Sequence, residues 1–239
     1  MILSLKNSLK FLIFFFLGFS PALAEKHDIF QGIAKQDGKI VYLEKHDVTF
    51  DDKDNVLEAK TVYTNPAGKT LAVLKSDFRK SLSLPDHVFV DERTKSTYGI
   101  RHDGDKVILF NQDPGKLEAT STLDNQSDRD RIQVGCQGFN YFLKGQINHL
   151  KEIKNQPVLF MIPGELSTYK FVLHFVSESS DQIVSFKVKI ENWLLRAFAP
   201  ELEFRYDRKI NRIVWYKGIS NIKNDQGKTM NVTIDYEYK

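Results

Sequence analysis

Alternation of apolar and polar residues is the feature of this 239-residue chain that most constrains its fold. In the stretch QIVSFKVKIEN, residues 182–192, every second side chain from residue 184 to residue 191 is apolar and those between are polar. The stretches ELEFRYD and TMNVTIDYEYK repeat the pattern. Successive side chains of a strand point to opposite faces, so each stretch predicts a strand with one buried and one wet face. Such clean alternation is typical of antiparallel sheets.

Turn signals between the alternating segments predict hairpins in series. Asp37-Gly38, Asp103-Gly104 and Gln226-Gly227 are turn dipeptides, and the segment NPAG at residues 65–68 favours a tight turn. We predict strands at residues 27–36, 39–50, 55–64, 69–78, 86–92, 96–102, 105–111, 157–162, 168–178, 182–191, 201–207, 211–218 and 229–238. The spacing indicates a mainly β fold, a curved antiparallel meander that forms an open or half β-barrel of about 11–13 strands.

Three segments break the period of two. Apolar residues recur at three- and four-residue steps between Phe139 and Leu150, which predicts one amphipathic helix at about residues 135–153, packed against the sheet. The stretch NWLLRAFAP predicts a short helix near 192–198, which Asn192 caps and Pro200 ends. Residues 111–131 offer few side chains to bury and predict a long loop.

The N-terminus has the layout of a secretory signal peptide. Lys6 and Lys10 precede an unbroken apolar run at 11–19, and the small residues Ala22 and Ala24 follow. The run is shorter than the roughly 20 residues that span a membrane, so we expect no stable membrane anchor. We therefore predict a cleaved signal peptide at 1–24, a single β-rich domain at 25–239, and a periplasmic location in a bacterial source.

Charge and cysteine content narrow the class of partner. The chain has 34 Lys and Arg against 31 Asp and Glu, and removal of Lys6 and Lys10 leaves a net charge of +1. A nearly neutral domain gives no electrostatic reason to expect a nucleic-acid partner. Cys136 is the single cysteine, so no intramolecular disulfide can form, and we expect it to be a small buried residue.

The sequence contains no local signature of catalysis. A basic residue followed by His-Asp occurs at 26–28, 45–47 and 101–103. Neighbouring residues on a strand point to opposite faces, so no His can converge with its own Asp on one ion, and we predict no metal site. No serine-hydrolase elbow, phosphate-binding loop or zinc-protease helix is present, so we predict no catalytic residues and no cofactor. Two carboxylates that meet only in the fold would still permit a hydrolase.

Aromatic residues gather in the last third of the chain. They either fill a core or line an apolar cavity, because a curled sheet of this many strands encloses more volume than one helix fills. In the second case, Tyr206, Tyr236 or His174 would orient a polar head group. The predicted cavity-lining residues are Phe142, His174, Phe186, Trp193, Phe204, Tyr206, Trp215 and Tyr236.

Three stretches, GKIVYLEKHDVTFD, YTNPAGKTLAVLKSDF and YDRKINRIVWYKGISNIKNDQGKTMNVTIDYEY, carry a resemblance to an uncharacterised family of exported proteobacterial proteins. The resemblance covers most of the mature chain and implies an exported protein without naming an activity. In architecture the chain is also distantly similar to periplasmic lipoprotein carriers, whose half-barrel holds acyl chains against a helical lid. No position here matches the cavity arginine of those carriers by motif.

These observations lead to one leading prediction and two alternatives. We predict a periplasmic binding or chaperone-like protein that holds a lipid, an acylated protein or another apolar ligand between the curved sheet and the helix at 135–153. The first alternative is an envelope assembly or structural partner that binds no small ligand and docks another protein through strand edges and the segment at 111–131. The second is a hydrolase of envelope polymers with a convergent acid-base pair.

Overall fold

The computed structural model describes residues 26–123, 128, 130–147, 149, 155–178, 182–192 and 201–238. The expected signal peptide and nearly all of the short helix expected near 192–198 lie outside the described residues. In the part of the chain that the structure describes, no helix has the length and apolar character needed to cross a membrane.

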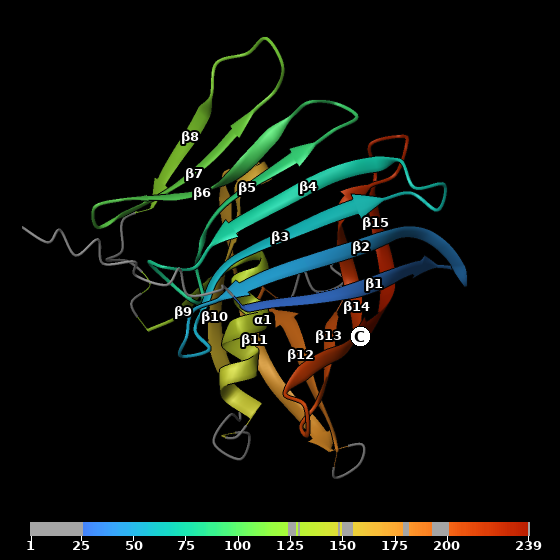
Figure 1. Cartoon of the computed structure of the whole chain (residues 1–239). Helices are drawn as coiled ribbons and strands as arrows, with labels where there is room; N and C mark the ends of the chain where they lie inside the picture. The colour runs from blue at the N-terminus through green and yellow to red at the C-terminus, as the bar shows by residue number, and fades with distance from the viewer. Residues whose placement is uncertain are drawn as a thin grey trace, which may run out of the picture.

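Within the described residues, fifteen strands form one continuous sheet that curls around helix α1 (Figure 1). The order is β8-β7-β6-β5-β4-β3-β2-β1-β15-β14-β13-β12-β11-β10-β9, so the first and last strands pair and most connections are hairpins. The strands are β1 (Lys26–Gln36), β2 (Lys39–Phe50), β3 (Val56–Thr64), β4 (Thr70–Asp77), β5 (Asp86–Asp91), β6 (Thr97–Asp103), β7 (Lys106–Gln112), β8 (Ala119–Leu123), β9 (Ile132–Gly135), β10 (Gln156–Ile162), β11 (Ser167–Glu178), β12 (Ile183–Ile190), β13 (Leu202–Asp207), β14 (Arg212–Lys223) and β15 (Thr229–Tyr238). Helix α1 covers Cys136–Gln146, and a 3-10 turn, η2, covers Pro163–Glu165.

The mainly β, largely antiparallel fold is confirmed, but the expected number of strands and the expected loop at 111–131 are wrong. β8 lies inside that segment and pairs with β7, and β9 pairs in parallel with β10. β8 has the polar sequence ATSTL and pairs on one side only, so no apolar face marks it. β9 has four residues, too few to show a period.

Helix α1 has the expected amphipathic stripe but is shorter than expected. Its buried residues include Phe139, Phe142 and Leu143. The described helix ends at Gln146, and residues 148 and 150–154 of the expected helix lie outside the described residues.

The sheet rolls into a spiral because the inner face of β6 and β7 packs on the outer face of β10. Val158 and Phe160 of β10 belong to the core around α1, whereas Leu159 and Met161 point the other way, into a second cluster with residues of β6 and β7. Both faces of β10 are therefore covered, which explains why its sequence, PVLFMI, is apolar without alternation. Side-chain packing and single hydrogen bonds, such as Gly135 N–H to the Ser83 carbonyl at 3.0 Å, close the spiral.

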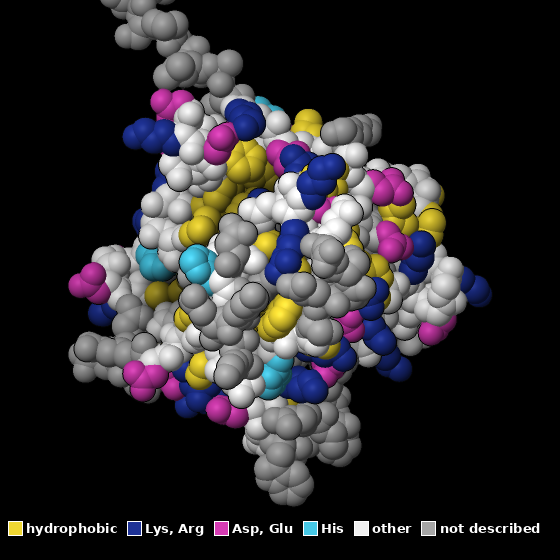
Figure 2. Space-filling view, turned by 90° about the horizontal axis from the view of Figure 1, so that it is seen from below, with side chains coloured by type: hydrophobic (Ala, Val, Ile, Leu, Met, Phe, Trp, Pro, Cys, Tyr) yellow, Lys and Arg dark blue, Asp and Glu magenta, His cyan; other side chains and the backbone are white. Residues whose placement is uncertain are grey.

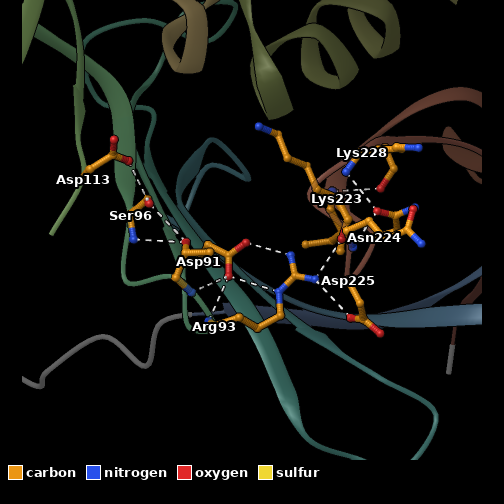
Figure 3. A network of polar contacts seen from close by, with 12 residues as sticks. Asp91, Arg93, Ser96, Asp113, Lys223, Asn224, Asp225 and Lys228 are labelled. Atoms are coloured by element: carbon orange, nitrogen blue, oxygen red, sulfur yellow. Dashed lines mark hydrogen bonds and ion pairs between the residues drawn. The ribbon is translucent and has the colours of Figure 1, made fainter.

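The β5–β6 and β14–β15 turns meet across the molecule (Figure 3). Arg93 donates from Nη1 to the Lys223 carbonyl at 2.8 Å. The same guanidinium pairs with both carboxylate oxygens of Asp91, at 3.1 Å from Nε to Oδ1 and 2.7 Å from Nη2 to Oδ2. A bidentate pair fixes the plane of the guanidinium, so Arg93 is a rigid bridge between turns that lie about 130 residues apart.

Candidate functional site in the barrel interior

Four of the predicted cavity residues meet in one aromatic core. Phe142, Phe186, Phe204 and Tyr206 belong to the same buried cluster, contributed by α1, β12 and β13. The Phe186 and Tyr206 rings lie 5.9 Å apart, nearly perpendicular to each other. Tyr236, on β15, packs against the edge of the cluster. We call the sheet side of this cluster, on β10 to β14, the aromatic wall.

The other predicted cavity residues are not found in this cluster. Trp193 lies outside the described residues. The Arg205 guanidinium lies over the Trp215 ring, 4.0 Å from the ring centroid. Arg205 stands between two inward-facing residues of β13, so Arg205 and the Trp215 ring beneath it lie on the outer face of the sheet. His174 is half-buried on β11 and follows the fully buried Leu173, which places it on the opposite face of that strand.

Helix α1 packs against the aromatic wall and covers it. Phe139 is 2% exposed, and its ring lies 4.7 Å from Phe160 and 5.1 Å from Phe204. Tyr206 donates its hydroxyl hydrogen to Asn140 Oδ1 at 2.7 Å. The helix approaches the loop before β5 so closely that a Cβ at Gly138 would lie 2.1 Å from the Ser83 carbonyl oxygen. Only glycine permits this docking position.

A chain of buried hydrogen bonds connects α1 to the opposite wall, on β2 to β4. Ser76 donates to Gln137 Oε1 at 2.8 Å, and Gln137 Nε2 donates to Thr61 Oγ1 at 2.6 Å. The Thr61 hydroxyl is 2.9 Å from His46 Nδ1, and His46 Nε2 is 2.9 Å from Glu44 Oε2. Since Thr61 already accepts from Gln137, its own hydrogen goes to His46 Nδ1, and His46 donates from Nε2 to Glu44.

Tyrosine side chains surround the Glu44 carboxylate. Burial, followed by the negative charge of Glu44, raises the pKa of Tyr42, Tyr63 and Tyr236 well above the usual value. Gly32 leaves room for the carboxylate, because a Cβ there would lie 3.0 Å from Glu44 Oε2. The tyrosine hydroxyls around Glu44 are thus held in their neutral form. Cys136 is half-buried and not fully buried as expected, and desolvation of its thiol raises the pKa to about 11, which disfavours the thiolate.

Sequence reasoning missed the Glu44–His46 pair. The prediction considered each His only with the Asp that follows it in sequence. His27 Nδ1 instead lies 2.7 Å from Asp47 Oδ1, across the β1–β2 pair. Residues at i and i+2 share a face of a strand, so Glu44 and His46 on the otherwise apolar face of β2 were the available signal. Among the described residues no cluster of three or more His, Cys, Asp or Glu could hold a metal ion.

A polar pocket of about 320 Å³ lies at the seam of the spiral, apart from the aromatic wall. Its lining includes Ser81, Ser83, His102 and Gln133. His102 Nδ1 lies 2.6 Å from Asp86 Oδ1, and Lys80 donates to Asp86 Oδ2 at 2.9 Å. Burial raises the pKa of Asp86, but hydrogen bonds from Lys80 and His102 outweigh it, and the net pKa is lowered. Asp86 is thus a carboxylate held in its charged form, and no apolar ligand suits this pocket.

The fold and interior define a mainly β, barrel-like protein with a helix inside the curl. No family model and no curated protein matches the chain. Among solved structures, the chain is similar to a beta-barrel-like protein of a domain of unknown function, DUF1849, from Brucella abortus. The two share 9% identity over 90% of this chain and 98% of that chain, with a TM-score of 0.37. This similarity is too low to transfer any property of that protein.

Proposed function

We propose that the mature chain is a periplasmic binding protein that holds a lipid, an acylated protein or another apolar ligand on the aromatic wall, in the place that α1 occupies. One observation supports this proposal. The wall is a continuous surface of aromatic and branched side chains on five strands, and an amphipathic helix covers it inside a curled sheet. A hydrocarbon chain offers the wall the same kind of contact as the apolar stripe of that helix.

The described cavities explain why the proposal requires α1 to move. The cavity beside α1 measures about 20 Å³, which is room for a single water molecule, and the 320 Å³ pocket is polar. An acyl chain therefore competes with the helix for the same wall. Each buried CH₂ contributes about 0.8 kcal/mol, so a chain of twelve carbons can offset the loss of the helix contacts.

The helix itself is well suited to such an exchange. Eleven residues are too few for a helix to be stable alone in water, so α1 depends on its docking contacts. No side chain caps its N-terminus, and it contains Gly138 and Gly145. A ligand that binds the open form shifts the population away from the docked helix in proportion to its preference for that form.

The test uses two glycine variants of α1. Gly138→Ala places a methyl group against the Ser83 carbonyl and pushes the helix away from its docking position. Gly145→Ala is the matched control, because nothing lies within 4 Å of a Cβ at that position. We expect faster uptake of a fluorescent fatty acid by Gly138→Ala than by the wild type, and unchanged uptake by Gly145→Ala.

Native mass spectrometry of the protein purified from periplasm provides the direct readout. The proposal predicts adducts whose mass matches a lipid and which exchange for added fatty acid. A ligand-free spectrum, together with no uptake by any of the three proteins, would reject it.

A second candidate is an envelope assembly partner, and the free edge of β8 favours it. β8 is the outermost strand of the described sheet, and its residues are mostly exposed. Leu117, just before the strand, is 94% exposed. An open edge is a template for strand addition by another protein. Thr120→Pro removes one N–H of the free edge, because Thr120 lies opposite Phe110 in a pair whose N–H groups point away from each other. Loss of a co-purifying partner with retained fatty-acid uptake would favour this role over ligand holding.

A further inference from the structure

The polar pocket of about 320 Å³, which we call the seam pocket, is built by three segments that lie far apart in the sequence. Ser81, Ser83 and Leu84 come from the loop before β5, and Gln133 comes from β9. The β6–β7 hairpin supplies His102, Gly104, Asp105 and Val107. Ligand pockets usually measure roughly 300–1,000 Å³, so the seam pocket suits a compact ligand.

The walls of the seam pocket are fixed by contacts within the protein. The Ser83 carbonyl accepts a hydrogen bond from Gly135 N–H at 3.0 Å. In the same loop, Leu84 N–H donates to Ser81 Oγ at 3.1 Å. Leu84 and Val107 are buried members of the cluster that closes the spiral, and they form the apolar part of the lining. The pocket is therefore preorganised, which lowers the entropic cost of binding a ligand.

His102 presents a hydrogen-bond acceptor to the seam pocket. Its Nδ1 lies 2.6 Å from Asp86 Oδ1, and its backbone N–H donates to the same oxygen at 2.8 Å. Asp86 is held as a carboxylate, which can only accept, so Nδ1 carries the ring hydrogen. In the neutral ring Nε2 is then an acceptor, and among the described residues it makes no hydrogen bond.

Three further polar side chains of the lining carry no charge, those of Ser81, Ser83 and Gln133. A hydroxyl group donates one hydrogen bond and accepts two, and an amide group donates and accepts through separate atoms. Together with His102 Nε2, which only accepts, these groups match a ligand that donates and accepts in several directions. Hydroxyl groups on adjacent carbon atoms meet this requirement.

The charged groups at the seam pocket give no strong preference for an ion. Lys80 donates to Asp86 Oδ2 at 2.9 Å, so the carboxylate behind His102 is already paired. In the part of the chain that the structure describes, Asp105 on the exposed β6–β7 turn is the one acidic residue of the lining. On the face seen from below, the described Lys and Arg side chains are interspersed with Asp and Glu side chains (Figure 2), so neither sign dominates that face.

We infer that the seam pocket binds a neutral polyhydroxylated ligand about as large as one sugar ring. One hydroxyl of the ligand donates to His102 Nε2, and others bind the hydroxyls of Ser81 and Ser83. The C–H groups of the ring pack on Leu84 and Val107. The site lies apart from the aromatic wall, so it does not depend on the proposed function.

The test is a titration of the ¹⁵N-labelled mature protein with small sugars, followed through its amide chemical shifts. Glucose, galactose and N-acetylglucosamine are the neutral probes, and glucosamine and glucuronate are charged probes with the same kind of ring. We expect a neutral sugar to shift the amides of residues 81–84, 102–107 and 133, with a dissociation constant of about 0.1–10 mM. The charged sugars should bind more weakly.

Three variants then assign the binding to the seam pocket. His102→Phe keeps a flat ring and removes the acceptor, and it should weaken binding about tenfold. Its matched control is His27→Phe, which removes a His–Asp contact of 2.7 Å on the exposed β1–β2 hairpin and should leave binding unchanged. Ser83→Ala should weaken binding about 2- to 10-fold, the effect of one neutral hydrogen bond. Thermal unfolding of each variant confirms that it is folded.

The outcomes decide between the site and its assigned ligand class. No shift in the three segments with any neutral sugar at up to about 50 mM, or equal affinity of His102→Phe and the wild type, would overturn the site. Tighter binding of glucosamine or glucuronate than of glucose would overturn the assignment to a neutral ligand. Fatty-acid uptake, measured on the same samples, tests the proposed function separately.

Discussion

The two halves of the sheet present different surfaces to the same helix. On the side of β2 to β4, one hydrogen-bonded chain with Glu44, His46 and Thr61 crosses an otherwise apolar interior. On the side of β10 to β14, the interior surface is the aromatic wall. Helix α1 contacts both, through Gln137 to the hydrogen-bonded chain and through Phe139 to the aromatic wall.

The two sides of the sheet hold α1 in different ways. Hydrogen bonds are directional, so the hydrogen-bonded chain fixes where α1 docks and in which rotation. Apolar contact is not directional, so the aromatic wall stabilises the docked helix without fixing its rotation.

Substitution in the aromatic wall should have the largest effect. Phe186 is fully buried and contacts Phe175 and Tyr206. We expect Phe186→Ala to lower the free energy of unfolding by about 3–5 kcal/mol, the sum of lost transfer energy and a new cavity. Urea denaturation measures it. A loss below about 1 kcal/mol would mean that the aromatic wall is loosely packed, and would contradict the difference between the two sides of the sheet.

Lowering the pH should reduce the free energy of unfolding through His87, a buried residue of β5. Burial lowers the pKa of His87 from 6.5 to about 4, and its hydrogen bond to the Pro85 carbonyl offsets only part of this. The unfolded state therefore binds the proton first, and stability falls as the pH drops from about 6.5 towards 4 by roughly 3 kcal/mol. His87→Gln should remove this part of the pH dependence in urea titrations at pH 7 and pH 4. The same slope in both proteins would contradict the assignment to His87.

Breaking the polar chain should have an intermediate effect. Thr61 is fully buried, and Thr61→Val leaves His46 Nδ1 and the Gln137 amide without their partner. We expect a loss of about 1–3 kcal/mol, the cost of buried unsatisfied groups. Thr122→Val, on the exposed face of β8, is the control and should stay within about 0.5 kcal/mol. Similar losses in both would show that the chain does not hold the helix.

Substitution at the junction of the two halves should change the stability of the fold least. β1 and β15 join them, and Lys35 pairs with Asp235 across that junction at 2.9 Å, with both side chains more than a third exposed. Exposed pairs contribute at most about 1 kcal/mol, so Lys35→Met should hardly change the melting temperature. A drop as large as that of Phe186→Ala would place the stability of the fold at the junction instead of in the walls.

Local patterns were enough to predict most strands. β2 and β15 have the predicted bounds, because alternation and turn dipeptides both mark their ends. β14 continues to Lys223, five residues beyond the prediction, through a segment in which Gly218 interrupts the apolar pattern. β8 was not predicted because it is an edge strand without a buried face, so its sequence does not alternate between apolar and polar residues.

The site depended on contacts between distant segments, which no local pattern contains. The aromatic residues of β12 and β13 were predicted to share one interior, and they do. That α1 fills this interior follows from Gly138, whose fit against Ser83 joins residues 55 positions apart. The partner of His46 was missed because sequence adjacency, not strand face, was compared.

Hydrogen exchange of α1 with and without ligand tests the central claim most directly. If a fatty acid takes the place of the helix on the aromatic wall, the amides of residues 136–146 should exchange faster once dodecanoate is bound, while those of β12 and β13 stay protected. Unchanged or stronger protection of α1 in a protein that demonstrably holds ligand would contradict the account.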